Sequence, residues 1–93
     1  MSATLKLRWT KVSPWGIWVD DTAFYCVRRR EPSARPGAVC PGGRPPEGWV
    51  YDAWLICPGV LSYLIGTSGM SRGAKAIAQD HVNKAIVALE AAA

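Results

Sequence analysis

Residues 15–30, WGIWVDDTAFYCVRRR, have the pattern of a β-hairpin. Two runs rich in aromatic and β-branched residues, 15–19 and 23–30, flank the polar residues 20–22, which are typical of a turn. Because successive strand side chains point to opposite faces, both faces of this hairpin carry large aromatic side chains. The stretch therefore predicts an antiparallel sheet and raises the question of what covers each face.

Three further strands are predicted on either side of a long connection. Residues 5–12 alternate between apolar and polar side chains, as in a half-buried strand. Residues 49–57 are apolar on both faces, which favours an interior strand, and residues 60–66 follow a Pro-Gly turn. The segment 31–48 holds five of the seven prolines and four of the nine glycines, so we expect a long loop there.

The C-terminal residues 71–91 predict a helix, with Ser68 or Ser71 able to cap its start. Apolar residues recur at helical spacing and form one stripe rich in alanine, which suits close packing on a sheet. The stripe consists of Ala74, Ile77, Ala78, His81, Val82, Ala85, Ile86 and Leu89. We therefore predict a single α+β domain over residues 1–93: one twisted, mainly antiparallel sheet of three to five strands, with one C-terminal helix packed on one face.

Composition and charge limit the possible classes of protein. The chain has 93 residues, five tryptophans and a formal net charge of +4. This moderate basic excess permits a nucleic acid or an acidic protein as partner. The start of the chain lacks the apolar core of a signal peptide, and the apolar run 53–66 is too short and too broken to span a membrane. We expect a soluble, cytoplasmic protein without a membrane partner.

The sequence gives little support to catalysis or metal binding. The three cysteines, Cys26, Cys40 and Cys57, accompany a single histidine, so no structural zinc set can be assembled, and free thiols are expected. A Cys26–Cys57 disulfide is possible only if the two strands that carry these cysteines are neighbours. His81 lies in the apolar stripe and fits a core histidine, and the adjacent Asp20 and Asp21 fit a turn. We predict no catalytic residue, no metal, no cofactor and no enzymatic activity.

The aromatic side chains predict a surface for a partner. One helix covers one face of the sheet, so the aromatics of the other face are exposed, lie under the 31–48 loop, or are buried against a partner or in a homodimer. Tryptophan, tyrosine and arginine are enriched among the residues that dominate binding energy. The predicted partner-binding residues are Trp15, Trp18, Tyr25, Arg28, Arg29, Arg30 and Trp54.

Two segments resemble a known DNA-binding domain. PWGIW at 14–18 and LIGTSGMSRGAKAIAQDHV at 64–82 resemble the plant ethylene-responsive-factor domain, whose layout is similar to that of phage integrase arm-binding domains. The resemblance implies a sheet that lies in the major groove of duplex DNA with the helix behind it. Trp15 and Trp18 match the sheet tryptophans of that family, and Gly66-Thr67 matches its strand-to-helix corner. Ser68 replaces the family's usual aromatic residue.

In size and style the chain also resembles the small accessory proteins of phages and prophages, among them the anti-CRISPR inhibitors. This resemblance implies a protein that works by occupying a surface of a host complex. Our leading hypothesis is a non-enzymatic protein-binding module, a phage-encoded inhibitor that sterically blocks a host protein or ribonucleoprotein complex of the CRISPR type. The alternative is a sheet-based module that binds duplex DNA, and a dimeric structural protein comes third.

Overall fold

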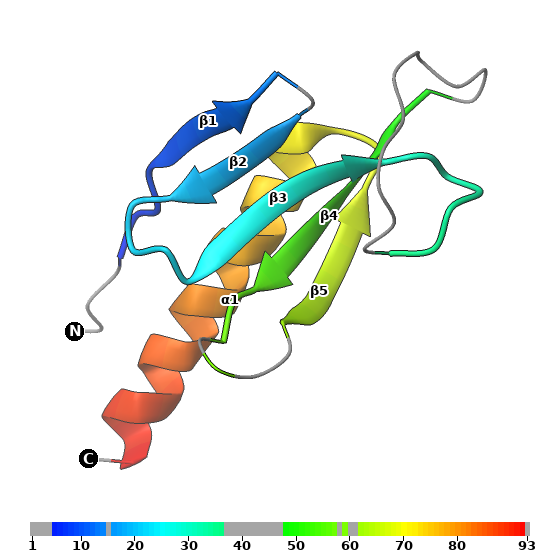
Figure 1. Cartoon of the computed structure of the whole chain (residues 1–93). Helices are drawn as coiled ribbons and strands as arrows, with labels where there is room; N and C mark the ends of the chain where they lie inside the picture. The colour runs from blue at the N-terminus through cyan, green and yellow to red at the C-terminus, as the bar shows by residue number, and fades with distance from the viewer. Residues whose placement is uncertain (1–4, 15, 37–47, 58, 60–61, 93) are drawn as a thin grey trace.

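A computed structural model describes residues 5–14, 16–36, 48–57, 59 and 62–92. Within them the chain forms five strands and one helix: β1 (Trp9–Ser13), β2 (Ile17–Asp20), β3 (Tyr25–Arg30), β4 (Val50–Leu55), β5 (Tyr63–Ser68) and α1 (Ser71–Ala92). All five strands belong to one antiparallel sheet in the order β1-β2-β3-β4-β5, and α1 crosses one face of it (Figure 1). The predicted α+β fold with a single sheet and a C-terminal helix is confirmed.

The predicted turn between β2 and β3 is built around Asp20. Its side chain is buried, with 3% of its surface exposed, and its carboxylate accepts hydrogen bonds from the backbone N–H groups of Thr22 (2.9 Å) and Tyr25 (2.7 Å). The Thr22 hydroxyl donates to the same carboxylate. Because these donors come from the turn itself, Asp20 fixes the hairpin and explains the pair of aspartates as a structural feature.

The core lies between the sheet and α1 in two clusters. Leu7, Tyr25, Ala78 and Val82 form one, and Val27, Ala53 and Ala74 form the other. Alanines at the helix surface allow close approach, as does Gly66 of β5: a Cβ there would lie 2.8 Å from Cγ2 of Ile77. A register shift between β4 and β5 accompanies this contact and lets Ile65 also reach the core.

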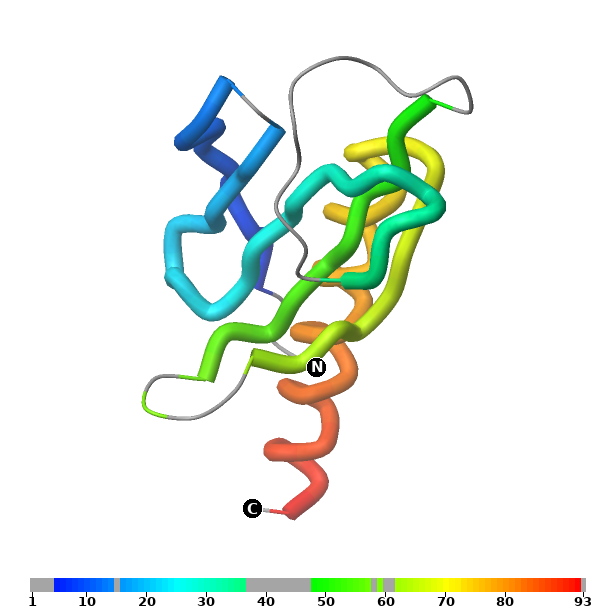
Figure 2. The backbone as a smooth tube through the Cα atoms, turned by 45° about the vertical axis from the view of Figure 1, so that its right-hand side comes forward, coloured from blue at the N-terminus to red at the C-terminus, as the bar shows by residue number. Residues whose placement is uncertain are grey.

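The helical stripe is confirmed for most of its length and wrong at its end. Ala74, Ala78 and Val82 are buried, and Ile77 and Ile86 pack against the two core clusters. Leu89, however, is 72% exposed. The last turns of α1 extend past the edge of the strands, so no sheet surface is left for this side chain to contact (Figure 2).

The first predicted strand is shorter than expected, because a helix side chain holds its N-terminal part. The Leu7 N–H donates to Oε1 of Gln79 at 2.9 Å, and Nε2 of Gln79 donates to the Leu5 carbonyl at 2.6 Å. These bonds bring Leu7 into the core without strand pairing, and β1 begins only at Trp9. Of the predicted loop 31–48, residues 31–36 and 48 are described without helix or strand, while residues 37–47 lie outside the described residues.

Candidate functional site

The sheet has an outer face, turned away from α1. Its residues follow from the alternation of side chains along each strand. Val27 and Ala53 pack under the helix, so their strand neighbours Cys26, Arg28 and Trp54 point outward. Cross-strand pairing places the adjacent side chains of β2 and β5 on the same face. The outer face consists of Ile17, Val19, Cys26, Arg28, Arg30, Val50, Asp52, Trp54, Leu64 and Thr67.

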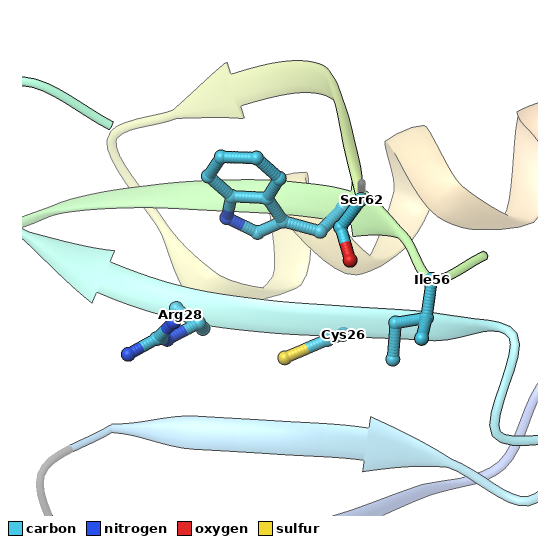
Figure 3. Close-up of a pocket in the computed structure, with 5 residues that line it drawn as sticks. Cys26, Arg28, Ile56 and Ser62 are labelled. Atoms are coloured by element: carbon cyan, nitrogen blue, oxygen red, sulfur yellow. The ribbon is translucent and has the colours of Figure 1, made fainter. Parts of the chain in front are cut away.

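A hollow of about 430 Å³ lies on this outer face. The residues that line it are Cys26, Arg28, Trp54, Ile56 and Ser62. Figure 3 shows Arg28 and Ile56 on either side of Cys26, with the helix behind the sheet. The hollow therefore combines apolar walls with one cationic side chain and one hydroxyl group, and it contains two of the predicted partner-binding residues, Arg28 and Trp54.

Charge in the hollow comes from Arg28 alone among its described lining residues. Arg28 is exposed, and no ion pair or hydrogen bond joins its guanidinium to another described residue. Burial raises the pKa of the Cys26 thiol, an effect that the nearby Arg28 charge partly offsets and the Asp20 charge reinforces. The thiol therefore stays protonated near neutral pH and serves as an apolar wall of the hollow.

Arg30 lies on the same face but is already paired. Its Nε and Nη2 atoms donate to Oδ2 and Oδ1 of Asp52 at 2.7 and 3.1 Å, and the Thr67 hydroxyl donates to Oδ1 at 2.7 Å. The bond to Asp52 raises the pKa of Arg30. Arg30 also donates to the Ala34 carbonyl, which holds the 31–36 segment against the sheet. Sequence reasoning missed this network, although a lone aspartate in an apolar strand is a signal for a buried partner.

The other predicted binding residues lie elsewhere. Tyr25 is 3% exposed, and its hydroxyl lies 2.7 Å from Nδ1 of the half-buried His81, so the Tyr25 side chain belongs to the core and is not presented at the surface. Trp18 and Arg29 are half-buried on the helix side of the sheet. Arg28 and Arg30 thus face away from Arg29, as the alternation of side chains along a strand requires, and Trp15 lies outside the described residues.

Cys26 and Cys57 are free thiols, so the disulfide left open by the sequence is not formed; Cys40 lies outside the described residues. In the described part of the chain, no three His, Cys, Asp or Glu side chains lie close enough to hold a metal ion. The helix of the described residues, α1, is not apolar enough over its length to cross a membrane.

Comparison with known proteins found no matching family model, no matching curated protein and no matching solved structure. The resemblances to the ethylene-responsive-factor domain and to phage accessory proteins therefore stay predictions.

Cysteine alkylation provides a direct check on the hollow. We expect iodoacetamide near pH 8 to modify Cys57 at least about tenfold faster than Cys26, because burial lowers both the thiolate fraction and the accessibility of Cys26. Peptide mapping by mass spectrometry at timed intervals measures the two rates. In concentrated guanidinium the rates should converge, and equal rates in the folded protein would contradict the placement of Cys26.

Proposed function

We propose that this chain is a non-enzymatic protein-binding module whose outer face receives a partner protein. In this proposal an apolar side chain of the partner enters the hollow beside Trp54, and an adjacent acidic residue of the partner pairs with Arg28. The observation that carries the proposal is the hollow itself, which joins an apolar wall to an exposed arginine that has no ion pair among the described residues.

The residue types in the hollow are those that dominate protein interfaces. Tryptophan and arginine in a pocket that loses its water on binding are the commonest energetic anchors. A volume of about 430 Å³ accommodates a large side chain. Around the hollow, the half-buried Ile17 and Val19 and the exposed Leu64 extend the apolar surface, which a specific interface of roughly 800 Å² per partner requires.

Binding of duplex DNA by the same face has less support. Of the three consecutive arginines, only Arg28 is left unpaired on the outer face, because Asp52 neutralises Arg30 and Arg29 points to the helix side. A single cation neutralises few phosphates, whereas phosphate contacts supply much of the affinity for DNA. This distribution of charge favours a protein partner for the outer face.

The biological setting is part of the proposal. A phage-encoded inhibitor that covers a surface of a host defence complex would need a binding face and no catalytic group, which is consistent with the hollow and its arginine. The partner would then be a protein, or the protein surface of a ribonucleoprotein, in the cytoplasm of the host cell. Binding would act by steric occlusion, since the apolar anchor and the arginine pair suffice to hold the module in place.

Differential capture tests the proposal. Wild-type chain, Trp54→Ala, Arg28→Glu and the control Val87→Ser are immobilised and exposed to a lysate of the source cell, and the retained proteins are identified by mass spectrometry. Val87 is a suitable control because it is 52% exposed on α1, away from the hollow. We expect a partner that wild type and Val87→Ser retain and that both outer-face variants lose.

The captured partner is then purified, and its affinity for each variant is measured. Loss of a tryptophan anchor typically costs about 2 kcal/mol or more, so Trp54→Ala should weaken binding by at least about 30-fold. A partner that binds all four chains equally, or that only Val87→Ser loses, would contradict the proposal. Self-association through the outer face would contradict it as well, in favour of a homodimer.

A further inference from the structure

A second surface lies on the helix side of the sheet, at the end where α1 begins. Four cationic side chains converge there from three elements: Lys11 from β1, Arg29 from β3, and Arg72 and Lys75 from α1. Trp18, Trp49 and Tyr51 lie among them. We call these seven residues the basic cluster.

Contacts between aromatic rings and cations make the cluster continuous. The Nζ atoms of Lys11 and Lys75 lie 5.5 and 4.9 Å from the centre of the Trp18 ring. Trp18 in turn packs on Tyr51, with ring centres 5.9 Å apart. The rings restrain the cationic side chains by cation–π attraction without neutralising their charge.

Arg29 joins the cluster through the neighbouring strand. Its guanidinium lies 4.3 Å from the centre of the Trp49 ring, and its backbone is paired with that of Tyr51 in the ladder between β3 and β4. Among the described residues, the buried Nε of Arg29 has no hydrogen-bond acceptor. Arg29 is therefore held in place with a donor that no described residue uses.

No ion pair between described residues involves these four cations. The ion pairs Arg30–Asp52 and Lys84–Asp80 join other cations of the described chain. The first turn of α1 contains no acidic residue and carries Arg72 instead, although the positive end of a helix dipole favours negative charge. Positive charge therefore accumulates at this end of the molecule and favours an anionic ligand.

An open hollow of about 400 Å³ borders the basic cluster, which contributes Tyr51 and Arg72 to its lining. It is lined by Tyr51, Gly69, Met70, Ser71 and Arg72. The Arg72 side chain is exposed at this hollow, and Tyr51 connects the hollow to Trp18 and so to the two lysines. A tetrahedral oxyanion placed here would meet an arginine fork, which suits phosphate oxygens in particular.

We propose that the basic cluster binds the phosphodiester backbone of duplex DNA. Several cations spread over three elements match a ligand with regularly repeated negative charges. The rings of Trp18 and Trp49 already contact the cations of the chain, so they are not free to stack with unpaired bases, and binding through phosphates alone does not depend on base sequence. This surface is separate from the outer face, and the proposal does not rest on the proposed function.

Fluorescence anisotropy with a labelled duplex of mixed sequence, about 20 base pairs long, tests the proposal on the full chain. Three or four phosphate contacts predict that affinity falls about 40- to 150-fold between about 50 and 200 mM salt. A second duplex of unrelated sequence should bind within about twofold, and the single strand should bind more weakly. Absence of binding at the lower salt concentration would overturn the proposal.

Paired variants locate the site. Arg72→Ala combined with Lys75→Gln should lower the log–log salt slope by about two units, as expected when two phosphate contacts are lost. The control, Arg8→Gln combined with Lys84→Gln, removes the same charge from exposed residues outside both proposed surfaces and should leave the slope unchanged. Loss of binding in the control alone would overturn the proposal and assign DNA binding to other surfaces.

A competition experiment tests whether the basic cluster prefers phosphate groups to carboxylate groups. Poly-glutamate of equal charge should displace the duplex only at much higher concentration, and displacement at equal concentration would overturn the assignment to phosphate. Because Arg72 and Lys75 are remote from the hollow on the outer face, their variants should retain the partner captured through Trp54. The two proposals can therefore fail independently.

Discussion

Asp52→Ala is expected to destabilise the protein by about 3–5 kcal/mol, because removing one partner of a buried ion pair leaves the other charge uncompensated. The Asp52 and Arg30 side chains are only 2% and 14% exposed, and the Thr67 hydroxyl also donates to the lost carboxylate. For a domain of this size such a loss lowers Tm by more than about 12 °C. Urea and thermal unfolding followed by circular dichroism measure the effect.

The surface pair Lys84–Asp80 provides the matched control. Its atoms lie 2.9 Å apart, but the two side chains are 78% and 63% exposed, so Asp80→Ala should change the stability by no more than about 0.5 kcal/mol. Asp52→Asn, which retains the shape and one acceptor oxygen, should fall between the two. Equal effects of Asp52→Ala and Asp80→Ala would show that Arg30 does not depend on a buried partner.

Ile77→Asp is expected to unfold the domain at room temperature or to leave it barely stable. Ile77 packs against the cluster of Val27, Ala53 and Ala74 and lies directly over Gly66, so an aspartate would bury a charge without a partner. The cost is several kcal/mol against a total stability of roughly 5–10 kcal/mol. Loss of the cooperative thermal transition is the readout.

Leu89→Asp is the control for the helix face, since Leu89 is 72% exposed where α1 extends past the sheet. This variant should melt within a few degrees of the wild type. The opposite ranking, with a stable Ile77→Asp and an unfolded Leu89→Asp, would mean that the helix presents its other side to the sheet.

Periodicity in the sequence was enough to predict the fold. Alternation along β3 assigned Arg28 and Arg29 to opposite faces, and helical spacing identified Ala74 and Ala78 as contacts with the sheet. Both periodicities depend only on the geometry of a single strand or helix, so they can be interpreted without knowledge of the tertiary structure. The structural role of Asp20 was likewise predictable from local sequence, because its carboxylate accepts hydrogen bonds from backbone N–H groups within five residues.

The binding residues were harder to predict because their environment depends on neighbouring strands. The alternation of side chains assigned Tyr25 to one face of the sheet. Whether that face is covered depends on α1, whose His81 contacts Tyr25 from 56 residues away in the sequence. Arg30 resembled its two neighbours in sequence, yet the register between β3 and β4 places it beside Asp52. The end of the helical stripe at Leu89 depended on the length of the strands, which periodicity does not give.

Dissociation kinetics of the captured partner test most directly whether the outer face is the binding surface. Surface plasmon resonance is used to compare wild type with Trp54→Ala, whose side chain lines the outer hollow, and with Trp18→Ala, whose side chain lies on the helix side. We expect Trp54→Ala to dissociate at least about 30-fold faster and Trp18→Ala to match the wild type. Faster dissociation of Trp18→Ala with an unchanged rate for Trp54→Ala would contradict the proposed function.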